Sequence, residues 1–307
     1  MGLRLFGYSF AGLVAALSLA VYYFIADGRL PNTPAFELDL ETLRDVASDT
    51  NEPLPHAIDV EVLARDDIPT FATHAGLDFS SRQMIRTAFL VKSDTHQTLI
   101  DIGMDRYVSR KFESGKEFYD DAFGRINKAI AESDAIAVTH EHPDHIGYLA
   151  RYPELAAISQ KLKLTQEQVA GTAIYAQSES IPDELRRVDT VSSTDLTLIA
   201  PGIVMIPAPG HTPGSVMFYV QTRDQTEIIF VGDVVWNISN VTNRSGRPRL
   251  VQNFLMQTPE SRSLVYQQVA ALVQLKETNP QIVLIPSHDE QHLDGLIEQG
   301  LIHRNFR

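Results

Sequence analysis

Four residues of the types that bind metal ions lie within six positions of this chain: His140, His142, Asp144 and His145. They follow the largely apolar run 134–138, which is typical of a buried strand. If that strand ends just before the cluster, the first two histidines share a face and can bind one ion, while the aspartate and the third histidine point at a second position. Imidazole nitrogen and carboxylate oxygen suit zinc, iron or manganese. Holding four such side chains together without an ion would be costly, so the spacing predicts a metal site rather than a loop decorated with histidines.

The six residues 140–145 resemble the HxHxDH signature of the metallo-β-lactamase-fold hydrolases. Further segments resemble the other motifs of that family, in the expected order: LIDIG at 99–103, APGHTPGS at 208–215, IIFVGD at 228–233 and LIPSHD at 284–289. The resemblance extends over roughly residues 57 to 300. It implies an α/β fold, an αββα sandwich of two mixed β-sheets flanked by helices.

The resemblance also implies two divalent metal ions, with zinc the first expectation. The seven implied ligands are His140, His142 and His211 for one ion, Asp144, His145 and His288 for the other, and Asp233 between them. Asp101, at the end of an earlier strand, would hold a ligand histidine in place, with an ordinary turn cap as the alternative. The remaining histidines are interpreted as structural or surface residues: His56, His74, His96, His292 and His303.

Two cations placed in this way imply a hydrolase. A water that bridges them loses a proton near neutral pH, and the hydroxide attacks a bond that an open coordination position polarises. Asp144 would lie beside this nucleophile, where it could pass a proton to the leaving group. The aspartate between the ions and the lack of cysteine resemble the lactonase and esterase branch more than the zinc β-lactamases, so a lactone or carboxylic ester is the expected bond.

Two other functions stay open at the level of sequence. A thioester or phosphoester hydrolase of the same fold is one alternative. A non-catalytic metal-binding interaction module is the other, although such a module would be expected to lack a ligand and all seven are present.

The composition restricts the partners. The chain has 307 residues, of which 44% are hydrophobic, so it can bury a large core. A formal net charge of −13 argues against nucleic acid or an anionic membrane surface as the main partner and leaves a small-molecule substrate. The absence of cysteine excludes disulfides and thiolate ligands.

The N-terminal segment 5–26 contains no charged residue and, as a helix, would be about 33 Å long. An uncleaved signal anchor at 1–26 is therefore expected, which would attach the protein to a membrane; a cleaved signal peptide, with secretion, and a buried soluble helix are the alternatives. A proline-rich acidic linker would follow at 27–55 and the hydrolase domain at 56–307. With Arg4 on the short side, the catalytic domain should lie outside the cytoplasm, on the periplasmic or extracellular side.

The pattern also predicts a short strand at 172–176 and a helix from Thr258, as N-cap, to about Lys276. Trp236 either lines the substrate pocket or packs in the core. The polar loop 237–249 holds three arginines that either meet an anionic group of the substrate or remain solvated surface charges: Arg244, Arg247 and Arg249.

Overall fold

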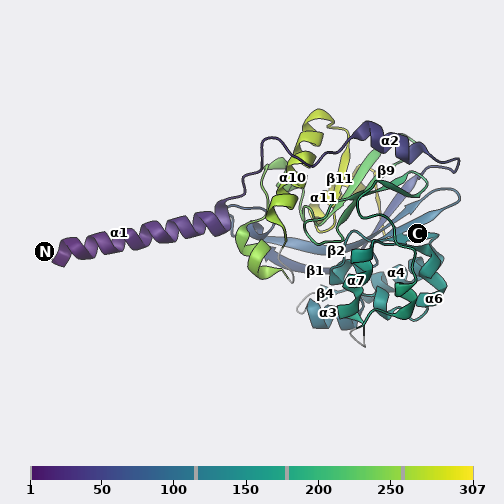
Figure 1. The fold of residues 1–307 in the computed structure, drawn as a ribbon, viewed down its shortest axis with the longest axis horizontal. Coiled ribbons are helices and arrows are strands. Elements are labelled where there is room, and N and C mark those ends of the chain that lie inside the picture. The colour runs from purple at the N-terminus through teal and green to yellow at the C-terminus, as the bar shows by residue number, and fades with distance from the viewer. Residues whose placement is uncertain (1, 114–116, 177–179, 257–259, 307) are drawn as a thin grey trace.

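The computed structural model describes residues 2–113, 117–176, 180–256 and 260–306. Two β-sheets pack face to face, and helices cover the outer face of each sheet (Figure 1). The predicted αββα sandwich of two mixed sheets is therefore confirmed.

The first sheet has the strand order β12-β1-β2-β3-β5-β6, with β4 paired to β1. Its strands are β1 (Ala57–Pro69), β2 (Ser81–Lys92), β3 (Gln97–Ile100), β4 (Glu117–Phe118), β5 (Ala135–Ala137), β6 (Leu162–Lys163) and β12 (His303–Arg304). The second sheet has the order β11-β10-β9-β8-β7, and only its β10–β11 pair is parallel. Its strands are β7 (Thr197–Ala200), β8 (Ile203–Pro207), β9 (Val216–Gln221), β10 (Glu227–Gly232) and β11 (Val283–Pro286).

Helices connect and cover the strands. The α-helices are α1 (Gly2–Val21), α2 (Leu40–Ser48), α3 (Arg106–Phe112), α4 (Asp120–Glu132), α5 (Pro143–Ile146), α6 (Leu155–Ile158), α7 (Gln166–Gly171), α8 (Asp183–Arg186), α9 (Ser239–Thr242), α10 (Arg262–Thr278) and α11 (Glu290–Glu298). Short 3₁₀ turns lie at Thr70–Ala72, Leu149–Arg151, Ser159–Lys161 and Thr172–Tyr175, and π-helical turns at Tyr22–Ala26 and Val251–Leu255.

Three buried apolar clusters hold these layers together. The central cluster lies between the sheets, where the rings of Phe89 and Phe230 pack with their centroids 4.9 Å apart. On the outer face of the first sheet, α4 buries Ile126 and Ile130, which are four positions apart and so share one side of the helix. On the outer face of the second sheet, α2 and α10 pack over the strands, with Val269 of α10 fully buried. The sandwich thus supplies a rigid frame for the loops at its edge.

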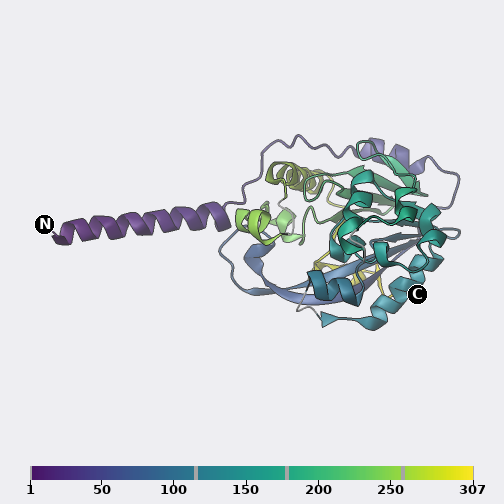
Figure 2. The same cartoon turned by 60° about the horizontal axis from the view of Figure 1, so that its bottom comes forward.

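The N-terminal helix α1 projects away from the sandwich in both views (Figures 1 and 2). In the part of the chain that the structure describes, no helix combines the length and the apolarity needed to cross a membrane. After α1 the chain returns to the sandwich, where the Gly76 N–H donates to the carbonyl of Ile25.

One predicted strand is wrong. Residues 172–176 form the 3₁₀ turn Thr172–Tyr175, which continues directly from α7. Short apolar runs do not distinguish a strand from a buried helical turn, and here the hydroxyl of Tyr175 donates to the carbonyl of Glu141. The predicted helix start at Thr258 lies outside the described residues, within which the helix runs over Arg262–Thr278.

Candidate metal centre

The loop after β5 carries four of the seven predicted ligands. The loop enters α5 at Pro143, the first helical position. A backbone N–H at this position would have no partner within the helix, so proline, which lacks one, costs nothing here. Because the N–H of His145 bonds the carbonyl of His142, the chain turns back on itself. This turn lies beside the ends of β10 and β11, which are followed by Asp233 and His288.

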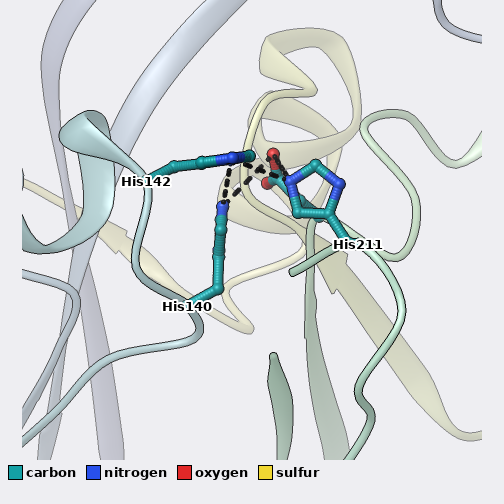
Figure 3. Close-up of side chains that lie close together, drawn as sticks. His140, His142 and His211 are labelled. Carbon is teal, nitrogen blue, oxygen red and sulfur yellow. Dashed lines mark hydrogen bonds and ion pairs between the residues drawn. The ribbon is translucent and has the colours of Figure 1, made fainter. Parts of the chain in front are cut away.

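The side chains of His140, His142 and His211 point toward one another (Figure 3). One oxygen of Asp233 lies within the same group. Nδ1 of His142 lies 3.1 Å from Nε2 of His140 and 3.0 Å from Nε2 of His211. Oδ2 of Asp233 lies 3.3 Å from Nε2 of His211 and 3.7 Å from Nε2 of His140. Ligand atoms about 2.0–2.1 Å from a tetrahedral zinc ion are roughly 3.4 Å apart, so these four atoms have the spacing of a coordination shell.

Asp144, His145 and His288 form a second group on the other side of Asp233. Oδ2 of Asp144 lies 3.6 Å from Nε2 of His145 and 3.7 Å from Nε2 of His288. Oδ1 of Asp233 lies 3.5 Å and 2.8 Å from the same two nitrogens. One oxygen of Asp233 therefore faces each group, as a carboxylate between two ions requires. The structure brings all seven residues together, and their binding of metal stays a prediction.

Carboxylates hold two of these histidines from behind. Oδ2 of Asp101 lies 2.8 Å from Nδ1 of His145, and Oδ1 accepts from the N–H of Thr139. Asp101 is fully buried and has a φ of 62°, a left-handed conformation that aspartate tolerates better than most residues. Oε2 of Glu260 lies 3.0 Å from Nδ1 of His211. A carboxylate behind an imidazole fixes its tautomer and leaves the other nitrogen to bind a metal.

Three buried atoms that face the second group make no hydrogen bond of acceptable geometry within the described residues, although the second and third lie 2.8 Å apart: Nε2 of His145, Nε2 of His288 and Oδ1 of Asp233. Buried polar atoms are almost always partnered, because an unmade hydrogen bond costs about 1–3 kcal/mol. A cation between these three atoms would satisfy all of them at once. The donor set therefore fits a metal ion.

The electrostatics of the site also suit cations. Burial, reinforced by nearby His211, lowers the pKa of His142 to about 3, so that its imidazole stays neutral and keeps a free lone pair. Burial alone would lower the pKa of His145 too, but the carboxylates of Asp101 and Asp144 outweigh it and raise the pKa to about 10. The carboxylates thus favour positive charge at this point, whether a proton or a metal ion supplies it.

Arg86 of β2 reaches the second group from the side. This arginine is 4% exposed, and its Nε lies 2.9 Å from Oδ2 of Asp144 and 3.0 Å from Oε2 of Glu113. Its Nη1 lies 3.2 Å from Oδ1 of Asp66. Burial raises the pKa of Asp144, but His145 and Arg86 lower it to about 2. The carboxylate therefore stays ionised, which suits a ligand, and its transfer of a proton to the leaving group stays a prediction.

Sequence reasoning missed three residues that organise the site. Arg86 and Glu260 lie in no motif, and nothing in the sequence marks them. Glu141 lies inside the HxHxDH signature at one of its variable positions. Its carboxylate accepts from the hydroxyl of Thr212 at 2.6 Å and the N–H of Gly214 at 3.0 Å, which joins two motifs. Its position between the predicted ligands His140 and His142 is the one feature of the sequence that could have pointed to Glu141.

The three arginines of 237–249 each pair with a carboxylate of the chain itself. The pairs are Arg244 with Glu277, Arg247 with Glu260 at 2.6 Å, and Arg249 with Asp27 at 2.7 Å. Arg247 is 1% exposed, so its interpretation as a surface charge is wrong. Its partner is the same Glu260 that holds His211.

A cavity of about 420 Å³ opens over the candidate metal centre. Trp236 lines it, as one of its two interpretations predicts, and its Nε1 donates to Oδ2 of Asp233 at 2.7 Å. Much of the remaining wall is apolar and includes Ile68, Pro69, Met84, Phe112, Leu255 and Met256. Arg86 is the only cationic side chain of the lining among the described residues, apart from the histidines.

Comparison with known families agrees with this geometry. The model of the metallo-beta-lactamase superfamily matches residues 82–288, which include all seven predicted ligands. The chain belongs to this superfamily.

Individual relatives are more distant. The chain is 25% identical over 167 residues to Glyoxylase B2 of Dictyostelium discoideum, covering 52% of this chain and 54% of the relative. It is 31% identical over 101 residues to a hydroxyacylglutathione hydrolase of Pseudomonas savastanoi pv. phaseolicola, covering 33% of each. The chain thus spans about half and a third of the lengths of these relatives.

Solved structures share the fold at low sequence identity. A quorum-quenching N-acyl homoserine lactone lactonase aligns with a TM-score of 0.59 at 13% identity, covering 79% of this chain and 95% of that one. A probable metal-dependent hydrolase from Staphylococcus aureus aligns with a TM-score of 0.52 at 14% identity, covering 78% and 91%.

Proposed function

We propose that this chain is a metal-dependent hydrolase that cleaves a lactone or carboxylic ester bond in a small, largely uncharged molecule. His140, His142 and His211 would hold one divalent ion, and Asp144, His145 and His288 the other, with Asp233 between them. Zinc is the first candidate, and iron or manganese would suit the same donors. Such ions, when bound, lower the pKa of water and polarise the bond under attack.

The side chains around the ligands have distinct tasks in this reaction. Asp101 fixes His145, and Glu260 fixes His211, in the tautomers that leave Nε2 free. Trp236 donates to Asp233 and so limits the rotation of that carboxylate. The apolar wall binds the hydrocarbon part of the substrate and keeps bulk water away from the reacting bond.

The proposed substrate class depends on the residues that line the cavity. Beyond the predicted ligands, the only cation among the described residues of the lining is Arg86, which already contacts Asp66, Glu113 and Asp144. An anionic group of a substrate would therefore have to compete with three carboxylates for the positive charge of Arg86. A neutral lactone or ester needs no such partner, and solved lactonases share the fold.

Thioester hydrolysis is the second candidate, because one relative is a hydroxyacylglutathione hydrolase. Glutathione carries net negative charge, for which the cavity wall offers no uncommitted cation among its described residues. A phosphoester meets the same objection. The binding-module alternative is disfavoured, because all seven predicted ligands converge beneath an open cavity.

The test compares substrates that differ in charge. The full chain, loaded with Zn²⁺, would be assayed with N-hexanoyl homoserine lactone, p-nitrophenyl hexanoate, S-lactoylglutathione and bis(p-nitrophenyl) phosphate. We expect kcat/KM for a neutral substrate to exceed that for both anionic ones by at least about tenfold. A preference for either anionic substrate would contradict the proposal.

Two variants control this assay. Asp233→Asn should abolish turnover and reduce the Zn²⁺ bound, because it removes a charge that faces both groups. Asp224→Asn alters a carboxylate that bonds Thr222 in the β9–β10 turn and should change neither. Turnover that survives in Asp233→Asn would exclude this centre as its source.

A further inference from the structure

The segment 25–29, between α1 and the sandwich, is docked tightly against the loop 245–249. The N–H of Gly246 donates to the carbonyl of Gly28 at 3.0 Å. A Cβ added at Gly28 would lie 2.1 Å from Oγ of Ser245 and 2.7 Å from Cβ of Ala75, so any other residue here would push these neighbours aside. Asp27 is 9% exposed. The docked segment therefore packs as part of the folded domain.

Asp27 binds two arginines of the domain. Its Oδ2 accepts from Nη1 of Arg249 at 2.7 Å, and its backbone carbonyl accepts from Nη2 of Arg262 at 2.6 Å. The guanidinium of Arg262 also lies 3.9 Å from the ring centre of Tyr266. Two contacts of different kinds, one to Asp27 and one to Tyr266, thus fix the position of Arg262 at the start of α10.

From Arg262 a continuous series of hydrogen bonds leads to His211. Nη1 of Arg262 donates to Oε1 of Gln252 at 2.6 Å, and Nε2 of Gln252 donates to Oε1 of Glu260 at 2.5 Å. The other oxygen of Glu260 lies 3.0 Å from Nδ1 of His211. Gln252 is fully buried and Glu260 is 5% exposed. Each intermediate side chain is thereby held at both ends.

A second series reaches Asp233 through Arg247. Nη1 of Arg262 also donates to the carbonyl of Arg247 at 3.0 Å. The guanidinium of Arg247 stacks 4.9 Å from the ring centre of Trp236, whose Nε1 donates to Oδ2 of Asp233. The two series end on His211 and on the oxygen of Asp233 that faces it, both in the same predicted metal position.

We propose that Arg262 and Asp27 are positioning residues for the metal held by His140, His142 and His211, and that the docked segment 25–29 is a functional part of the centre. Without Arg262, the buried Oε1 of Gln252 loses its donor, and the amide can rotate away from Glu260. The carboxylate behind His211 then loses one of the contacts that fix it. The inference rests on the proposed metal binding. It adds two residues outside the ligand set that hold one of the ligands in position.

The experiment measures the affinity of the full chain for Zn²⁺ by competition with a chromophoric chelator. Substitutions that remove such outer partners typically cost 10- to 100-fold in metal affinity. For Arg262→Met we expect about a 10-fold loss for one Zn²⁺ equivalent, with the other changed by less than about twofold. Arg262→Lys, which keeps a donor, should recover most of the loss. Arg44→Met removes an arginine that pairs with Glu227 on another side of the sandwich and should change neither equivalent.

Two further measurements assign the effect. In a His288→Ala background, which disables the second group, Arg262→Met should weaken the remaining Zn²⁺ equivalent by the same factor. If docking of the segment 25–29 strengthens Zn²⁺ binding, Zn²⁺ binding must strengthen that docking by the same factor. Zn²⁺ should therefore slow amide hydrogen exchange of 25–29 in the wild-type chain, and slow it less in Arg262→Met.

Unchanged Zn²⁺ affinity in Arg262→Met, or equal weakening of both equivalents, would overturn the inference and leave the proposed function intact. Exchange at 25–29 that does not respond to Zn²⁺ in the wild-type chain would also overturn it. If the wild-type chain binds no Zn²⁺, iron or manganese, the proposed function fails as well.

Discussion

Replacing Asp101 by asparagine tests how the second group is held. Asparagine has the same shape and also tolerates the φ of 62° at this position, so the backbone should be little disturbed. Its oxygen can still accept from the N–H of Thr139. Its amide nitrogen, however, would face Nδ1 of His145 as a second donor, which favours the tautomer that protonates Nε2 and blocks metal binding.

The size of the effect follows from the bond that is lost. A hydrogen bond to a charged group contributes about 1.5–3 kcal/mol. Since 1.36 kcal/mol corresponds to a factor of ten, Zn²⁺ should bind roughly 10- to 150-fold more weakly at the group that contains His145. Full burial of Asp101 and its short distance of 2.8 Å to His145 favour the upper part of this range.

The assay is Zn²⁺ competition with a chelator, alongside urea denaturation of the metal-free chain. Asp101→Gly is the matched control, because it relieves the left-handed backbone while removing the same contact. Both variants should lose affinity for one Zn²⁺ equivalent. An Asp101→Asn chain that binds two equivalents with wild-type affinity would refute the reasoning.

Two further predictions concern stability. Phe230→Ala removes a ring that packs against Phe89 between the sheets and should lower the free energy of unfolding by about 3–5 kcal/mol in urea denaturation; a loss below about 1 kcal/mol would contradict tight packing there. Burial raises the pKa of Glu227, but hydrogen bonds from Arg44 and Tyr219 outweigh it, so the folded pKa lies below the unfolded one. The stabilisation is then present above about pH 4.3 and is lost as the pH falls towards the folded pKa, so Glu227→Gln should destabilise the chain more at pH 7 than at pH 3. An equal effect at both pH values would speak against the charged pair.

Sequence reasoning succeeded where the information is local. The ligand cluster of 140–145 lies at the end of one strand, and its spacing alone indicates two metal positions. The order of the motifs is consistent with the αββα sandwich, which the structure confirms. The run 172–176 was misjudged because its apolar residues suit a strand or a buried turn equally, and only its packing after α7 decides between them.

The sequence by itself determined the family, the fold and the set of candidate ligands, because these depend on residue types at fixed spacings along single strands and turns. Only the tertiary structure decided how the set is held. Arg86 meets Asp144 from a strand more than fifty positions earlier, and Asp27 is joined to His211 through three side chains that lie more than 220 positions after it. Such contacts depend on where the folded chain places distant backbone segments, and a buried arginine or glutamate has the same appearance in a sequence as an exposed one.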